Sequence, residues 1–284
     1  MKEKIDIATA GGHSIVAHVF ATQKTARGVC IIAPATGVGQ YLYDDFALWL
    51  TKQGYHVITF DYNGMGLSVD GHVKHCRSDK LGWAKYDCSA VIDYAQQHFP
   101  QQKLIWFGHS VGGHMLGMME NSYTNRLDKI ITVASGTGTW WYNSAPTKRI
   151  VWLVWYFLVP LTVPLLGYFP GKKLKVMCDL PKDVMLQWRR WCLNEDYAVG
   201  HEGDWLRERF AGVKTPMTIL SFSDDEMMSP KSISDLHKFF SGAPQSAVTV
   251  HPHDVNQKAI RHIGWHRERY RELWDKFILS ELPG

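Results

Sequence analysis

One serine between two glycines is the residue of this sequence best placed to do covalent chemistry. Ser110 lies in LIWFGHSVGGHML (104–116), with Gly108 two residues before it and Gly112 two residues after it. The motif G-x-S-x-G follows an apolar, strand-like run and opens a helix-like segment, so it falls at a sharp turn that holds the hydroxyl clear of the backbone. Side chains at the two glycine positions would collide in such a turn. We therefore predict that Ser110 is a nucleophile and not an ordinary polar turn residue.

A serine nucleophile needs a base to take its proton and an acid to orient that base. Two adjacent carboxylates, Asp224 and Asp225, directly follow the apolar run TPMTILSFS, and a short stretch leads from them to Pro230. We predict Asp225 as the acid because of this layout, and Asp224 is the alternative.

The predicted base comes from RHIGWH, which holds two histidines. His262 precedes Ile-Gly-Trp and the expected final helix, so it occupies a loop. His266 is expected inside that helix, on its surface. The chain order Ser110, Asp225, His262 is one of the known orders of a Ser-His-Asp triad.

Strand-like and helix-like segments alternate on both sides of these residues. Apolar alternation on either side of Gly11-Gly12 predicts a β-hairpin. The predicted strands are 29–34, 56–62, 103–109, 129–135, 217–223 and 246–252, and the predicted helices are 43–54, 81–99, 111–120, 230–240 and a last one from about Gly264. This alternation is typical of an α/β protein with a mostly parallel, doubly wound sheet.

The alternation stops between about Gly136 and Val213, a region that holds seven of the twelve tryptophans. We therefore predict a core of residues 1–136 and 214–284, interrupted by a mainly helical cap at 137–213. Within the cap, residues 151–169 carry no charge and are long enough to span a bilayer. Pro160 and Pro164 make one straight helix unexpected there, since each removes a helix hydrogen bond.

A membrane crossing at 151–169 would separate Ser110 from Asp225 and His262, so crossing and catalysis exclude each other. We expect this segment to cover the serine and bind a hydrophobic acyl group, with a peripheral membrane contact through the cap as a further possibility. The tryptophans expected to bind substrate are Trp155, Trp188 and Trp191.

Two further motifs make the whole chain resemble the α/β-hydrolase family. VITFDYNGMGLS is similar to that family's DxRGxGxS turn, with Asn63 in place of arginine, and IIAPATGVGQYLYDDFA is similar to its strand followed by His-Gly, with Pro34-Ala35 at those positions. GYFPGKKL, DLP and QWRRWC resemble a group of bacterial predicted hydrolases. The resemblance implies an oxyanion hole made by the backbone N–H groups of Thr36 and Val111, with Val38 as the alternative to Thr36.

Composition and residue spacing bear on the expected partners, the cellular compartment and the need for a metal or cofactor. The net charge is +4 and the basic residues are scattered, so no nucleic-acid partner is expected. The five cysteines lack a disulfide spacing and MKEKIDIATA lacks an apolar signal segment, which indicates the cytoplasm. No metal-ligand spacing is apparent and the predicted chemistry needs no cofactor.

These residues predict a serine hydrolase that cleaves an ester with a hydrophobic acyl group, or a thioester or amide, through an acyl-enzyme on Ser110. An acyltransferase would use the same triad. A non-catalytic receptor for a small apolar ligand is the alternative from another class. The sequence leaves the oligomeric state open.

Overall fold

The computed structural model describes residues 2–283, apart from the side chain of residue 146. Eight strands form one sheet in the order β1-β2-β4-β3-β5-β6-β9-β10. Their bounds are β1 (Lys2–Ala8), β2 (Ser14–Phe20), β3 (Gly28–Ala33), β4 (Tyr55–Phe60), β5 (Leu104–His109), β6 (Lys129–Val133), β9 (Met217–Phe222) and β10 (Gln245–Val250). The pairs β1-β2 and β2-β4 are antiparallel and the other pairs are parallel. The predicted hairpin and the mostly parallel sheet are confirmed.

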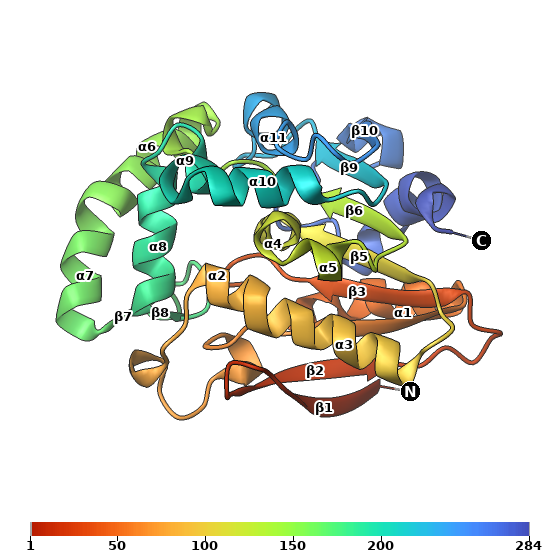
Figure 1. Cartoon of the computed structure of the whole chain (residues 1–284). Helices are drawn as coiled ribbons and strands as arrows, with labels where there is room; N and C mark the ends of the chain where they lie inside the picture. Colours follow the sequence, from red (N-terminus) through yellow and green to blue (C-terminus); the bar gives the residue numbers. More distant parts are fainter. Residues whose placement is uncertain (1, 284) are drawn as a thin grey trace.

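Helices cover both faces of this sheet because its strands are apolar on both sides (Figure 1). On one face lie α3 (Ser89–His98), α4 (Val111–Met118) and α10 (Asp204–Gly212). On the other, α1 (Asp44–Lys52) packs with the C-terminal segment, where Phe46 and Trp49 contact the ring of Trp274. The carboxyl ends of β3, β5, β6, β9 and β10 therefore meet at one edge of the sheet, where ligands bind in open α/β sheets.

The remaining elements are short or belong to the segment between β6 and β9. Within the core they are η1 (Gln40–Tyr43), η2 (Gly66–Ser68), η3 (Val73–His75), α2 (Lys80–Gly82), η4 (Trp83–Cys88), α5 (Asn121–Thr124), α11 (Pro230–His237), η7 (Pro252–Val255), η8 (Glu268–Tyr270), α12 (Arg271–Leu273), η9 (Trp274–Ile278) and η10 (Leu279–Glu281). Between β6 and β9 they are η5 (Trp140–Tyr142), α6 (Ala145–Leu153), η6 (Val154–Leu158), α7 (Val159–Leu166), β7 (Tyr168–Phe169), β8 (Leu180–Pro181), α8 (Lys182–Cys192) and α9 (Tyr197–Glu202).

The segment between β6 and β9 has two parts. Helices α6 to α9 and the β7-β8 pair stand beside the sheet, at the left of Figure 1. Helix α10, which the predicted cap at 137–213 also includes, packs instead against α4. A Cβ atom built on Gly117 would lie 2.3 Å from the ring of Phe210, so the small residue on α4 is what lets the two helices approach.

The apolar run of the cap is one continuous helix, Thr147–Leu166, made of α6, η6 and α7. By length and composition alone it could cross a membrane. A π-helical turn, η6, directly precedes the Val159-Pro160 step. This turn adjusts the backbone to the proline, which has no N–H to donate to the preceding turn.

The C-terminal helix begins later than expected, at Glu268 instead of about Gly264, and is divided into short 3-10, α and π segments. The prediction that His266 lies on a helix surface is wrong. His266 lies in a turn and is fully buried, with its ring 4.9 Å from the ring of Tyr43. Burial lowers the pKa of His266 to about 4. The neutral ring of His266 is buried beside Tyr43 of η1. Local sequence patterns do not predict this burial, because it depends on a contact between distant segments.

Candidate active site

The turn between β5 and α4 holds Ser110 in a strained conformation, with φ 52° and ψ −114°. A Cβ atom at Gly108 would lie 2.5 Å from the Gly113 nitrogen, and one at Gly112 would lie 2.3 Å from the Ala33 carbonyl oxygen. The backbone of the neighbouring strand and of the turn itself therefore excludes any larger residue at both positions. This is the steric reason that the sequence predicts for the two glycines.

Hydrogen bonds from β6 and the loop after it keep the serine turn in place. The N–H of Ser110 donates to the Val133 carbonyl at 2.9 Å. The hydroxyl of Ser135 donates to the Ser110 carbonyl at 2.8 Å and lies 3.1 Å from the Gly108 carbonyl. Ser135 comes from a region with no sequence motif, so its supporting position becomes visible only in the structure.

The structure brings Asp225 and His262 together. Asp225 Oδ2 lies 2.9 Å from His262 Nδ1, and both side chains are almost completely buried. The other carboxylate oxygen, Oδ1, accepts the N–H groups of Met227 and Met228, each at 2.8 Å. A carboxylate held in this way accepts the Nδ1 proton and leaves His262 Nε2 as the proton acceptor.

The neighbours of Asp225 hold the histidine loop by its backbone. Asp224 accepts the N–H groups of Ile260 at 2.8 Å and Arg261 at 3.2 Å. Glu226 Oε2 accepts the N–H of His262 at 3.0 Å. Three consecutive carboxylates after β9 thus hold the loop after β10. The backbone contacts of Asp224 and Glu226 could not be predicted from the sequence.

A buried chain of hydrogen bonds connects the loop after β3 to the histidine loop. The N–H of Ala35 donates to Tyr43 Oη at 3.0 Å, Tyr43 Oη lies 2.7 Å from His109 Nδ1, and His109 Nε2 lies 3.1 Å from the His262 carbonyl oxygen. The carbonyl can only accept, so Nε2 carries the proton of His109 and Nδ1 accepts the tyrosine hydroxyl. Burial lowers the pKa of His109 well below its usual value, which favours this neutral form.

Two backbone N–H groups beside Ser110 remain available to hold a negative oxygen. Val111 is the first residue of α4, and the N–H groups of a first helical turn have no partner within the helix. In the part of the chain that the structure describes, the N–H of Thr36 has no hydrogen-bond partner, whereas the N–H of Val38 donates to the Ala35 carbonyl at 3.1 Å. Of the two candidates in this loop, Thr36 has the free donor.

Ser110, His262, Thr36 and Val111 all line one cavity of about 410 Å³. The cap supplies most of its apolar wall, including Trp155 and Trp188, whose rings meet edge to face at 5.2 Å. Trp191 is not among the described residues that line it. Its ring is fully buried, and its Nε1–H donates to Glu202 Oε1 at 2.8 Å. Trp191 lies only three residues after Trp188 on α8, yet its ring packs inside the cap, 5.7 Å from the ring of Tyr197.

The cavity also contains one buried cation that sequence reasoning missed. Lys80 lines it and is fully buried. Its Nζ donates to Thr36 Oγ1 at 2.7 Å and lies 4.1 Å from the ring centre of Trp188. Burial lowers the pKa of Lys80 to about 7. No sequence motif surrounds this lysine, so only the fold places it beside the nucleophile.

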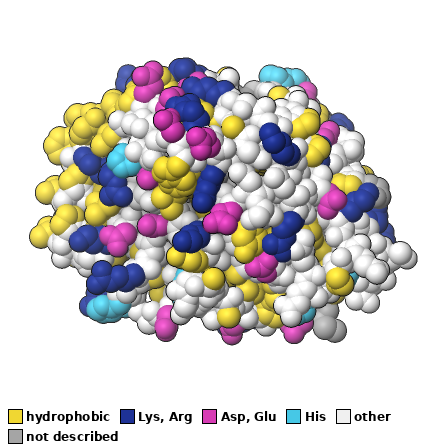
Figure 2. Space-filling view, viewed as in Figure 1, with side chains coloured by type: hydrophobic (Ala, Val, Ile, Leu, Met, Phe, Trp, Pro, Cys, Tyr) yellow, Lys and Arg dark blue, Asp and Glu magenta, His cyan; other side chains and the backbone are white. Residues whose placement is uncertain are grey.

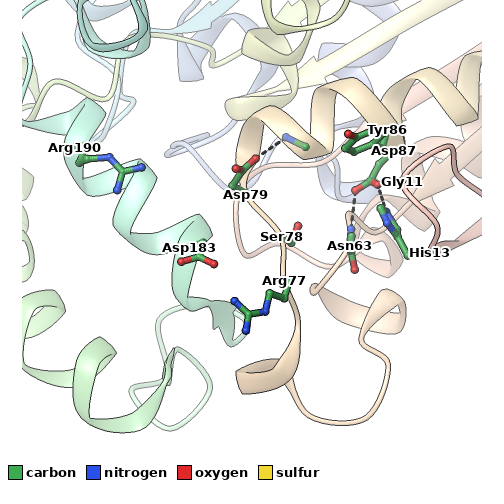
Figure 3. Close-up of a pocket in the computed structure, with 11 residues that line it drawn as sticks. Gly11, His13, Asn63, Arg77, Ser78, Asp79, Tyr86, Asp87, Asp183 and Arg190 are labelled. Carbon is green, nitrogen blue, oxygen red and sulfur yellow. Dashed lines mark hydrogen bonds and ion pairs between the residues drawn. The ribbon is translucent and has the colours of Figure 1, made fainter.

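A second pocket, of about 450 Å³, shares no lining residue with the catalytic cavity. Figure 3 shows Asp87 on its wall, with dashed lines to the His13 ring and to the backbone nitrogen of Asn63. Asp87 pairs with His13 Nε2 at 2.7 Å and accepts the N–H of Asn63 at 2.8 Å. The hydrogen bond to Asp87 raises the pKa of His13. These groups form hydrogen bonds with one another, so they hold the hairpin turn against η4.

Among residues 2–283, no group of three His, Cys, Asp or Glu side chains could hold a metal ion.

The fold and this site together define a class of protein. A mostly parallel sheet that carries a strained serine turn after β5, an aspartate after β9 and a histidine after β10 is the arrangement of a serine hydrolase with the α/β-hydrolase fold. The family model described as "Serine aminopeptidase, S33" matches residues 24–254, which is most of the chain. The chain therefore belongs to this family of α/β-hydrolases and is a hydrolase.

Solved structures with similar folds include esterases and a thioesterase. A thermostable carboxyl esterase from Bacillus coagulans has a TM-score of 0.65 at 11% identity, with 99% of this chain and 98% of that chain covered. A cold-adapted esterase from an Arctic intertidal metagenomic library has a TM-score of 0.58 at 13% identity, covering 99% and 94%. The thioesterase domain from the curacin biosynthetic pathway has a TM-score of 0.57 at 17% identity, covering 97% and 98%. These likenesses show the fold. A comparison with curated proteins finds no significant match.

Proposed function

We propose that this protein is a serine esterase that cleaves esters with a hydrophobic acyl group through an acyl-enzyme on Ser110. The observation that carries the proposal is a single cavity that holds Ser110 and His262 between the sheet edge and an apolar cap wall. Hydrophobic walls of this kind bind hydrocarbon, and the few polar groups among them orient the reacting bond.

In the proposed reaction, His262 Nε2 takes the proton of Ser110 as the serine oxygen attacks the ester carbonyl. The N–H groups of Thr36 and Val111 stabilise the resulting negative oxygen. His262 then returns the proton to the leaving alcohol, and a water molecule activated by the same nitrogen releases the acid. Asp225 keeps the His262 imidazole in the tautomer that these reaction steps require, with the proton on Nδ1.

The family description names an aminopeptidase, but the cavity favours another substrate. A peptide amino terminus is a cation, and its recognition requires a carboxylate or several backbone acceptors. Among the described residues that line the cavity none is Asp or Glu, and the one Lys or Arg is Lys80. The described lining side chains thus offer no carboxylate to an ammonium group, and Lys80 repels one when it is charged, so we propose an ester in preference to a peptide.

Two other proposals follow from the same residues. An acyltransferase would use the same triad and differ only in keeping water away from the acyl-enzyme.

We place the protein in a reducing compartment, the cytoplasm, because all five cysteines are free, three of them buried.

The test is a panel of p-nitrophenyl esters from acetyl to octanoyl, combined with fluorophosphonate labelling. Each methylene that enters an apolar pocket contributes about 0.8 kcal/mol, close to a fourfold rise in kcat/KM, until the pocket is full. The label should appear on Ser110 and be absent from Ser110→Ala. Labelling of another serine would contradict the assignment of Ser110, and an unlabelled protein without ester turnover would favour a non-catalytic receptor. A flat chain-length profile would contradict the acyl pocket.

A further inference from the structure

The cap helix from Thr147 to Leu166 presents an apolar face to the solvent. Only 17% of an apolar stretch of 18 residues in this helix is buried, whereas a core helix of a soluble protein is mostly buried. We call its exposed large hydrophobic residues that do not line the cavity the docking face: Trp152, Leu153, Tyr156, Phe157, Leu161, Leu165 and Leu166. Figure 2 shows hydrophobic side chains gathered at the left edge, where Figure 1 places α6 and α7. A contiguous exposed apolar surface of this kind marks an interaction site.

The charged residues that flank the docking face along the chain are positive as far as Asp179. No Asp or Glu occurs between Asp128 and Asp179. Basic residues stand at both ends of the helix: Lys148 and Arg149 near its start, and Lys172, Lys173 and Lys175 after its end. An apolar helix face with a cationic border complements the hydrocarbon and the anionic headgroups of a lipid surface.

The catalytic cavity opens beside this face. Three residues both line the cavity and are exposed, namely Ile150, Leu174 and Val176. The opposite side of the helix, with Val154 and Trp155, forms the inner wall of the same cavity. One helix therefore separates the docking face from the place where an acyl chain would lie.

We propose that the docking face inserts into the surface of a membrane that contains anionic lipids, and that the cavity takes its ester from that surface. The helix lies on the membrane and does not cross it, because Val159 and Val163 are buried in the protein and the chain on both sides of the helix builds one cavity. Membrane binding stands by itself, while the uptake of an ester rests on the proposed function.

The experiment measures co-sedimentation with vesicles of phosphatidylcholine alone and of phosphatidylcholine with an equal amount of phosphatidylglycerol. The test variant replaces Phe157, Leu161 and Leu165 by Gln, since these side chains are 51%, 61% and 82% exposed and do not line the cavity. The matched control is the double variant Leu48→Gln and Leu67→Gln. These two side chains are 48% and 52% exposed and lie outside the cap. Ser110→Ala tests binding without catalysis.

We expect the wild type, the control and Ser110→Ala to bind the anionic vesicles, and to bind phosphatidylcholine more weakly. The triple variant should lose at least about tenfold in affinity, since even part of three hydrophobic side chains contributes that much. It should keep its kcat/KM on soluble esters and lose turnover only on esters carried in vesicles. Equal binding by wild type and triple variant would overturn the proposal. So would a wild-type dimer that the triple variant dissociates, because a second copy would then cover the face. Vesicle binding without turnover of any ester would contradict only the proposed function.

A separate observation concerns the buried cation in the cavity. The ammonium group of Lys80 donates to Thr36 Oγ1 and lies over Trp188, and no Asp or Glu among the described lining residues neutralises it. Other buried polar atoms of the cavity wall have no partner in the described part of the chain: His114 Nδ1, Asn143 Oδ1 and Trp155 Nε1. Buried polar groups without partners are costly and persist where a ligand satisfies them.

We infer that Lys80 binds a carboxylate carried by the substrate, so that the acyl group is apolar along its length and negatively charged at one point. A bound carboxylate is a counter-ion that favours the ammonium form of Lys80, and it accepts the N–H groups of Lys80 that do not bond to Thr36 Oγ1. This inference deepens the proposed function, because the charged group selects among hydrophobic esters.

The test compares p-nitrophenyl octanoate with the p-nitrophenyl monoester of octanedioic acid. Lys80→Met should lower the ratio of kcat/KM for the carboxylate ester to that for octanoate at least about tenfold, the effect of losing a charge-assisted hydrogen bond. Lys85→Met, an exposed lysine on the same segment, should keep the wild-type ratio. An unchanged ratio in Lys80→Met would overturn the inference. If the wild type cleaves neither ester, the proposed function fails. Calorimetric binding of octanedioate by wild type and Lys80→Met then still decides the role of the lysine.

Discussion

Tyr43 and His109 form the clearest positioning pair at the level of single residues. The Tyr43 hydroxyl accepts the Ala35 N–H and contacts His109, which in turn holds the His262 carbonyl. Tyr43→Phe removes the hydroxyl and leaves two buried groups without partners, at a cost of about 1–3 kcal/mol. We expect kcat on esters to fall about tenfold with little change in KM, because the loops that carry the base and the oxyanion donor shift.

The matched control for this prediction is Tyr55→Phe. Tyr55 also donates a buried hydroxyl, to the Pro283 carbonyl, but it lies away from the site. Both variants should lose stability, and only Tyr43→Phe should lose kcat. Equal kinetic losses would show that Tyr43 acts through stability alone.

The adjacent carboxylates after β9 have different tasks and should respond differently to amide substitution. Asp225→Asn leaves a group that no longer stabilises the Nδ1–H tautomer of His262, so kcat should fall on the order of ten-thousandfold. Asp224→Asn keeps an oxygen that can accept the N–H of Ile260 or Arg261, so its kcat should fall far less. Steady-state kinetics on one ester measures both, and the reverse ranking would contradict the assignment.

The buried Lys80 makes stability depend on pH. Its pKa falls from 10.5 to about 7 on folding because burial disfavours the charge. Between these values the unfolded chain binds a proton that the folded chain does not, so the free energy of unfolding rises with pH, by up to about 1.4 kcal/mol per pH unit. Urea unfolding of wild type and Lys80→Met should show this rise only in the wild type. Parallel pH dependence in both proteins would contradict it.

At the level of elements, the cap helices α6 to α8 supply much of the apolar wall of the cavity, which we propose binds the acyl group. Trp155→Ala or Trp188→Ala should flatten the rise of kcat/KM with acyl length more than it lowers activity on acetyl esters, since a short chain does not reach these rings. Trp205→Ala is the control, because Trp205 is exposed on α10 and does not line the cavity. A full slope in both cap variants would mean that the acyl chain lies elsewhere.

Sequence periodicity predicts the elements of the core well and those of the cap poorly. The central strands of the sheet, such as β3, β5 and β9, are buried apolar runs with turn residues at their ends, and these patterns are local. In the cap, the uncharged run 151–169 has the same composition whether it is buried, exposed or inside a bilayer. Only the packing of Val159 and Val163 inward, with Leu161 and Leu165 outward, distinguishes these states.

At the level of the whole molecule, cap and core share one hydrophobic cluster. Trp155, Val163 and Met185 of the cap belong to the same buried cluster as Trp106 and Met115 of the core. We therefore expect one cooperative unfolding transition, because separate unfolding of the cap would expose part of the core. Tryptophan fluorescence, circular dichroism and ester turnover should lose their native signal at the same denaturant concentration. Loss of turnover well before circular dichroism would show a cap that unfolds independently.

The sequence alone determined the serine turn, because Gly108, Ser110 and Gly112 must be contiguous to build it. It also determined the parallel sheet and the order of acid and base along the chain. Only the tertiary structure shows that Asp225, and not Asp224, contacts the ring of His262, since side-chain direction at the end of β9 depends on how the loops after β9 and β10 meet.

The tertiary structure also decided what surrounds the triad. Lys80, Tyr43 and His109 converge on the site from segments far apart in sequence, and no spacing rule connects them to Ser110. Trp188 lines the cavity, whereas Trp191 contacts Glu202 and Tyr197 inside the cap, and the spacing of the two tryptophans on α8 does not predict this difference. Local patterns report the period of each element, whereas contacts between distant segments depend on how the elements pack.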